Sequence, residues 1–299
     1  MVVLELVLLA LLLAYRIYID AVSKRWEVYS YLFFALGFLL FEFEDASAAP
    51  LYLLLLILFN IVSTNYGSKK SLAFSVLLLF AILLSINGLL FAQSAFMGIF
   101  PGVIGLKSKS PKKDKALEIR RDAVHLLAGI IILFIASFFY FWAREAITVL
   151  IILGFALGNY TTISKDRIAL FLRSFERRNT KFGSGAIWLS LGILIAIGFI
   201  FPNGIMQAVL AAILVGDPLA TIIGIKFGMH KLPYNKEKSL EGTIAYFAAT
   251  SILSYIFIGF AGIAIALIAA FIESWNIKID DNFLVSFVLA LFLLVLFYF

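Results

Sequence analysis

The sequence contains no cysteine, only two histidines, and few charged residues, which make up 14% of the chain. Without cysteine the chain can form no disulfide framework, and this absence leaves the redox compartment open. Few charges go together with many apolar residues: 63% of the chain is hydrophobic and the mean hydropathy is +1.06. This mean hydropathy is far above the range of water-soluble domains, which excludes a soluble globular domain. The chain is therefore predicted to be an integral membrane protein.

Long apolar runs make up most of the sequence. They are mostly about 15 to 20 residues long and are separated by short charged loops, which is typical of helices rather than of the alternating strands of an outer-membrane barrel. We predict an all-α, polytopic transmembrane helical bundle of roughly 10–12 spans. The run at 2–19 is interpreted as a retained first span. In the second half the expected spans are 122–142, 146–163, 184–201, 205–225, 242–260, 262–273 and 283–299.

The basic residues predict which loops share a side, because Lys and Arg concentrate in cytoplasmic loops. If the N-terminus lies outside, every Lys and Arg except Arg144 falls in an internal loop. These loops account for the formal net charge of +6 without a nucleic-acid partner. The internal loops expected in the second half are 103–121, 164–183, 226–241 and 274–282.

The ionisable residues also predict a division of the chain. Residues 1–102 hold few charged groups within their spans, whereas polar residues recur at the span ends after the basic loop Leu106–Asp122. We therefore predict an N-terminal region of transmembrane helices at 1–102. The catalytic transmembrane domain, with cytoplasmic nucleotide-binding loops, is expected at 103–299.

Two basic elements open this domain. In RRDAVHLLAG, a helix that begins at Arg121 places His125 on the same face, one turn deeper in the membrane. Further on, Arg177 and Lys181 precede a Gly-Ser-Gly that is expected to open a helix, where backbone N–H groups can bind an anion. Each element also has a plainer interpretation, a snorkelling Arg for the first and positive-inside charge before a helix cap for the second.

The third element, GDPLATIIGIKFG from Gly216 to Gly228, places a carboxylate and a proline inside an apolar run. Pro218 is expected to break the helix at Asp217, near its cytoplasmic end, and irregular backbone at membrane depth is tolerated only beside a cavity or buried protein. An intramembrane carboxylate is a functional candidate by default. Gly224 and Gly228 are expected to leave small surfaces for close helix packing.

The sequence KSLEGT follows at the expected start of the next helix. Lys238, Ser239, Glu241 and Gly242 lie there, in a position suited to holding phosphate or metal. Glu241 is alternatively a capping-box partner, and His230 is interpreted as a solvated loop residue.

A short acidic loop near the C-terminus is the fourth element. It contains Glu273, Asp280, Asp281 and Asn282 in a chain whose other internal loops are strongly basic. Hard oxygen ligands of this kind suit Mg²⁺, which usually takes one or two carboxylates together with substrate phosphates. The alternative is a solvated acidic loop without a ligand.

All four elements are expected on the same side of the membrane, which predicts phosphoryl or nucleotidyl transfer to a lipid. The sequence has neither a P-loop pattern nor a soluble-kinase glycine loop with its catalytic-loop pattern. It resembles instead the dolichol kinase and phytol kinase family of CTP-dependent polyprenol kinases. The residues that carry the resemblance are Arg121, His125 and Gly129; Glu176, Arg177, Gly183 and Trp188; GDPLATIIGIKFG; KSLEGTIA; and Glu273 with IDDN.

The resemblance implies transfer of the γ-phosphate of CTP to the hydroxyl of a long isoprenoid alcohol, with Mg²⁺, at the cytoplasmic face. It places the nucleotide and metal sites at Gly216, Asp217, Gly224, Gly228, Lys238, Ser239, Glu241, Gly242, Glu273, Asp280, Asp281 and Asn282. Pro218 and Asp122 depart from the family pattern.

The expected roles follow from the chemistry of phosphoryl transfer, which needs a metal, cations on the phosphates and a carboxylate near the attacking hydroxyl. Asp217 is assigned to the metal, and Asp280 or Asp281 is the second ligand or the base. Lys238 is the best phosphate contact, with Arg121, Arg177 and Lys181 as weaker ones. A CTP-dependent lipid cytidylyltransferase, a diacylglycerol kinase and, more remotely, a secondary transporter are the alternative functions.

Overall fold

The structure, a computed structural model, describes residues 114–139, 141–177, 183–199, 203–275, 277 and 280–298, with isolated positions before residue 97. Within these ranges it has helices and a single isolated antiparallel bridge, between Lys231 and Ser239. The prediction of an all-α fold is confirmed. The expected region 1–102 and most of the count of 10–12 spans lie outside the described residues.

The described helices follow the predicted spans closely. Their bounds are α6 Lys115–Phe138, α7 Ala143–Ile163, α8 Arg167–Arg173, α9 Ser184–Phe199, α10 Asn203–Ala211, η1 Ala212–Gly216, α11 Asp217–Phe227, α12 Leu240–Ile258, α13 Phe260–Ser274 and α14 Asp281–Tyr298. The largest difference is at α6, which was expected to start at 121 or 122. It begins at Lys115 because the Asp114 side chain accepts a hydrogen bond from the Ala116 N–H at 3.0 Å and caps the helix.

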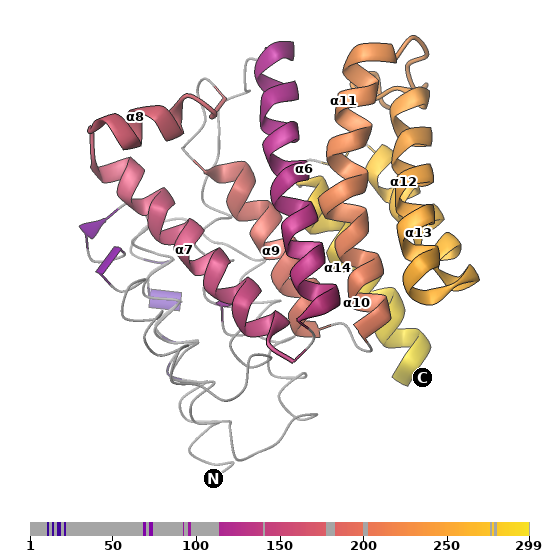
Figure 1. The fold of residues 1–299 in the computed structure, drawn as a ribbon, viewed down its shortest axis with the longest axis horizontal. Coiled ribbons are helices and arrows are strands. Elements are labelled where there is room, and N and C mark those ends of the chain that lie inside the picture. The colour runs from indigo at the N-terminus through magenta and orange to yellow at the C-terminus, as the bar shows by residue number, and fades with distance from the viewer. Residues whose placement is uncertain are drawn as a thin grey trace.

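Four of the described helical segments are long and apolar enough to cross a membrane. They are α6, α7, α12 and the continuous segment Gly204–Phe227, which contains η1 and α11. These helices identify a membrane protein. The N-terminal end of α6, α8 and the connection between α11 and α12 lie at the same end of the bundle, at the top of Figure 1. The assignment of that end to the cytoplasm stays a prediction.

The prediction that Pro218 breaks its helix is wrong. α10, η1 and α11 form one continuous rod, in which η1 is a π-helical turn and the Asp217 N–H bonds to the Ala212 carbonyl. A proline ring obstructs the carbonyl four residues earlier and brings no N–H. The wider π turn ends at Gly216, so Pro218 lies in the first turn of α11. A backbone N–H is not needed for helix hydrogen bonding at that position, and proline is therefore tolerated there.

The depth expected for Asp217 is also corrected. Asp217 is the first residue of the 11-residue α11, so about 15 Å of helix separates it from Phe227. The carboxylate therefore lies inside the rod and not near its end. The neighbouring η1 is buried throughout, which places Asp217 at the edge of the core.

α13 ends, and α14 begins, at a similar depth. α13 has 15 residues, about 22 Å of helix, which is less than the ~30 Å of a bilayer core. α13 runs antiparallel to α12 after Gly259, whose positive φ of 62° makes the tight turn. In Figure 1, α11 and α12 reach further up than α13 and α14, so the C-terminal end of α13 and the N-terminal end of α14 lie below the top of the bundle.

Glycines hold α11 and α12 close together. A Cβ atom at Gly242 would lie 2.8 Å from the Ala220 carbonyl oxygen, and one at Gly228 would collide with the Gly224 carbonyl and with Ser239. Gly216 faces Tyr246 and Thr250 in the same way. The expectation that Gly224 and Gly228 allow close packing is confirmed. We call this contact the α11–α12 seam.

Candidate functional site

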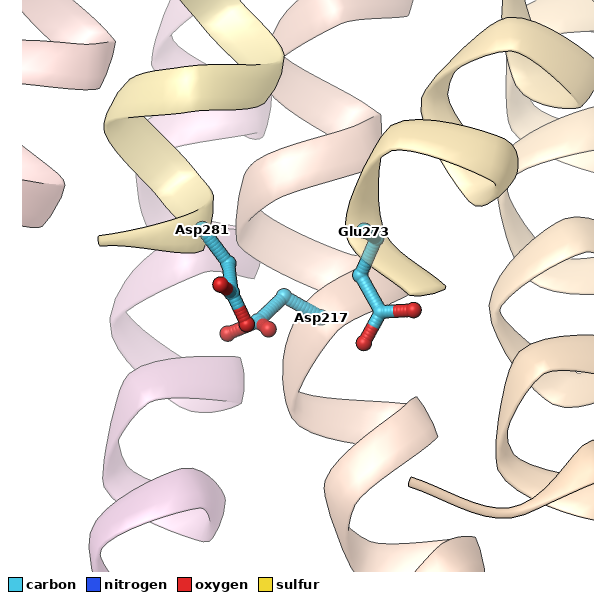
Figure 2. A group of neighbouring side chains, drawn as sticks. All are labelled: Asp217, Glu273 and Asp281. Carbon is cyan, nitrogen blue, oxygen red and sulfur yellow. The ribbon is translucent and has the colours of Figure 1, made fainter. Parts of the chain in front are cut away.

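Three carboxylates converge where the rod and the two short helices meet. Asp217 begins α11, Glu273 is the next-to-last residue of α13, and Asp281 begins α14. Each offers an oxygen, and these oxygens all lie within 4.8 Å of one another. Figure 2 shows the three side chains pointing toward a common space from three different helices. The third and fourth sequence elements, which lie far apart along the chain, therefore form a single cluster.

The chemistry of this cluster fits a divalent cation. All its donors are hard carboxylate oxygens, which Mg²⁺ and Ca²⁺ prefer. Among the described residues, Glu273 Oε2 and the neighbouring Asn282 Oδ1 are buried without a hydrogen-bond partner. Buried polar atoms of this kind are costly unless a ligand satisfies them. Asp217, Glu273 and Asp281 are therefore the residues that would hold a metal.

Lys238 supplies positive charge to the cluster. Its Nζ donates to Glu273 Oε1 and to Asp281 Oδ2, both at 2.6 Å, and to the Glu273 backbone carbonyl. Burial opposes the charge on Lys238, but the Glu273 and Asp281 carboxylates outweigh it and raise the pKa of the ammonium above its usual value. Lys238, which was predicted to contact a phosphate, thus lies among the carboxylates.

The connection between α11 and α12 folds over the end of α13 and so brings Lys238 to the cluster. Tyr234 shares a hydrogen bond of 2.9 Å with the Ser274 hydroxyl, and the Asn235 side-chain amide donates to the Ser274 carbonyl at 3.0 Å. Asn235 is buried by this contact. The two bonds anchor the connection to the acidic end of α13.

The remaining residues of KSLEGT have structural contacts. Ser239 caps α12, and its hydroxyl accepts from the Gly242 N–H at 3.2 Å. Glu241 accepts from the His230 backbone N–H at 3.1 Å and lies 2.6 Å from His230 Nδ1, so it is not the reciprocal partner of a capping box. Ser239 and Gly242 line the cavity described below, whereas Glu241 is absent from its described lining.

The Arg and His element of α6 also reaches the cluster. His125 Nδ1 lies 3.9 Å from Asp217 Oδ2, and both side chains are mostly buried. Arg121, one turn earlier, lines the same cavity. An element whose signal is weak in the sequence thus gains significance from its position beside Asp217.

Arg177 is held by a glutamate that the sequence analysis missed. Its Nε and Nη2 donate to Glu118 Oε1 and Oε2 at 2.7 and 2.6 Å, a bidentate pair that raises the pKa of Arg177. Glu118 lies one turn before Arg121 on α6, in a segment that had been assigned to the loop. Recognising Asp114 as the helix cap would have revealed it. Lys181 lies outside the described residues.

The structure separates Asp280 from Asp281. The Asp280 side chain accepts from the Asn282 N–H at 3.2 Å and its carbonyl accepts from the Leu284 N–H at 3.0 Å, so it caps α14. Burial, followed by the charge of Asp281, raises the pKa of the Asp280 carboxyl to about 7. Asp280 lines the cavity, but it is not one of the three clustered carboxylates.

One cavity of about 1190 Å³ connects these groups. The three carboxylates, Lys238, His125 and Arg121 line it, together with Lys115 and Arg177. Further acidic side chains, among them Glu118, Asp122 and Glu176, also line it, and so do apolar side chains of α6, α7, α8 and α9. A cavity of this size with both charged and apolar walls is suited to a ligand with both characters.

Comparison with known proteins places the chain among archaeal and plant relatives. It is 38% identical over 178 residues to the uncharacterized protein MJ1137 of Methanocaldococcus jannaschii, a match that covers 58% of this chain and 91% of the other. The chain belongs to the family of this archaeal protein. No protein-family model and no solved structure matches the chain.

The chain is also similar to parts of two plant kinases. The chain is 38% identical over 101 residues to the chloroplast farnesol kinase of Arabidopsis thaliana, covering 28% of this chain and 33% of that enzyme. It is 28% identical over 174 residues to phytol kinase 1 of the same plant, covering 54% and 56%. The chain thus spans a third to just over half of the length of these two kinases.

Proposed function

We propose that the protein is a CTP-dependent kinase that phosphorylates the hydroxyl of a long isoprenoid alcohol, with Mg²⁺, at the cytoplasmic face of the membrane. The observation that carries the proposal is the cluster of Asp217, Glu273 and Asp281 in a cavity whose walls include cationic and apolar side chains. Phosphoryl transfer needs metal-binding carboxylates and cations near the phosphates, and a lipid acceptor needs an apolar wall.

The relatives support the acceptor class. Both plant kinases are named for isoprenoid alcohols, farnesol and phytol. The choice of CTP is supported by the resemblance of GDPLATIIGIKFG and KSLEGT to the polyprenol kinases. In the structure these two segments form the seam beside the carboxylates.

The proposed reaction forms a bond between the alcohol oxygen and the γ-phosphorus of CTP and breaks the bond from that phosphorus to CDP. The hydroxyl proton passes to a carboxylate of the cluster. Mg²⁺, when bound, would neutralise charge on the phosphates. Lys238 holds one oxygen each of Glu273 and Asp281, so the second oxygens of these carboxylates would be left for a metal, and the ammonium would lie beside the phosphates. His125 is placed to orient Asp217.

The test uses purified protein in detergent with Mg²⁺, each of CTP, ATP, GTP and UTP, and a panel of isoprenoid alcohols with diacylglycerol. CDP together with a monophosphorylated isoprenoid is the expected result. Pyrophosphate together with a CDP-lipid would show a cytidylyltransferase, and a phosphorylated diacylglycerol would move the acceptor class. No turnover with any pair would remove the proposal.

A further inference from the structure

The cavity has two kinds of wall. Its polar part is lined by charged side chains of both signs, the cations Lys115, Arg121 and Arg177 among them. Between α6 and α7 it is lined by apolar residues and glycines, namely Val124, Ala128, Ile151, Gly154, Leu157 and Gly158. We call this apolar part the α6–α7 slot. Because both walls belong to one cavity, the slot is continuous with the carboxylate cluster.

The slot lies at the outer surface of the described helices. α6 and α7 meet at the turn that follows Phe138 and diverge toward the end of the bundle that carries the site (Figure 1). Both helices are long and apolar enough to span a membrane. Val124 of α6 is 53% exposed and Leu157 of α7 is 43% exposed, although both line the cavity. The slot therefore opens sideways, between two helices that are long enough to span a membrane.

Gly154 makes room in the slot. A Cβ atom built on it meets nothing within 4 Å, in contrast to every glycine of the α11–α12 seam. Glycine in a helix interior costs about 0.5–1 kcal/mol relative to alanine. Gly154 is exposed and lines the cavity, so no packing contact requires the missing side chain and a ligand can approach the backbone of α7 here. With Ile151 and Gly158 it forms one face of α7 at helical spacing.

We propose that the α6–α7 slot is the binding site for the hydrocarbon tail of the acceptor, which slides in laterally from the bilayer. This proposal rests on the proposed function for the class of acceptor. The acceptor hydroxyl lies at the carboxylates, and its tail has to extend from there along apolar side chains. An apolar chain gains no binding free energy beside the charged groups of Lys115, Arg121 and Arg177. The polar part of the cavity then receives the nucleotide, so the two substrates have separate entrances.

The decisive experiment fills the slot without touching the cluster. Gly154→Trp is expected to lower kcat/KM for farnesol by ~10-fold or more, since losing apolar contacts in a pocket changes selectivity by that order. The rate with a single-isoprene alcohol and the KM for the nucleotide are expected to stay at the wild-type values, because neither ligand occupies the slot. Leu157→Trp, on the same helix, is expected to act in the same way.

Ala264→Trp is the matched control, since Ala264 is exposed on α13 and absent from the described lining of the cavity. It is expected to leave both alcohols unaffected, and Gly154→Ala is expected to retain farnesol turnover in a folded protein. Wild-type kcat/KM for farnesol in both Gly154→Trp and Leu157→Trp would overturn the proposal.

A binding measurement keeps the slot separate from the kinase activity. A farnesol analogue with a photoreactive diazirine is expected to label peptides of α6 and α7 without nucleotide, and Gly154→Trp is expected to abolish this labelling. If no nucleotide and alcohol pair gives turnover but the labelling behaves as stated, the proposed function fails and the slot stands. Labelling confined to other helices would overturn the slot whatever the turnover.

Discussion

The α11–α12 seam and the α6–α7 slot both contain glycine, yet they use it in opposite ways. In the seam, atoms of the neighbouring helix or connection occupy the space beside Gly228 and Gly242. In the slot, Gly154 is exposed and lines the cavity, and no atom lies within 4 Å of a Cβ built on it. The seam fixes the helix that carries Asp217 against the segment that carries Lys238, whereas the slot leaves room for a ligand. The same residue type therefore serves rigidity on one side of the site and access on the other.

The largest loss of turnover is expected from substitutions in the carboxylate cluster. Asp217→Asn and Asp281→Asn should each lower turnover by ~1000-fold or more, since each decade corresponds to about 1.4 kcal/mol and metal-ligating groups contribute several kcal/mol to the transition state. Initial rates with saturating Mg²⁺ and CTP check this. Asp280→Asn is the matched control, because Asn caps a helix as well as Asp does, and it should lose much less. Equal losses at 280 and 281 would mean that the clustering does not define the metal site.

The next effect concerns stability and separates the two glycines. Gly228→Ala should destabilise the protein by about 1–3 kcal/mol, because its Cβ collides with the Gly224 carbonyl and Ser239. Gly154→Ala should instead stabilise α7 by about 0.5–1 kcal/mol. Thermal unfolding in detergent measures both changes. A lower melting temperature for Gly154→Ala would show that the slot is a packed contact and not an empty one.

The sequence indicates which residues form the candidate site but not how they come together. Asp217, Glu273 and Asp281 could be predicted because carboxylates in an apolar chain are expensive and need a reason. Their convergence could not, since it depends on α13 being too short to span and on a π turn in the rod. The wrong expectation at Pro218 has the same origin, because a helix absorbs a proline when the preceding turn widens.

Adjacent residues show a second limit of sequence patterns. Asp280 and Asp281 are chemically equal in the sequence, and only the backbone at the start of α14 gives one the cap and the other the cluster. Glu118 was missed because the start of α6 was placed after it. Glycine spacing likewise indicated close packing in the seam correctly, but it cannot distinguish a filled space from an empty one.

The smallest effect is expected at the cavity wall where Glu118 holds Arg177. A double-mutant cycle with Glu118→Gln and Arg177→Met should give a coupling of about 1 kcal/mol in the free energy of unfolding, because the pair is bidentate but Arg177 is partly exposed. The pair orients Arg177 toward the polar part of the cavity, so Glu118→Gln should raise the KM for CTP more than it lowers kcat. The farnesol KM should stay unchanged, because Glu118 lies outside the slot. A change confined to the farnesol KM would instead connect this part of the wall to the tail site and contradict separate entrances for the two substrates.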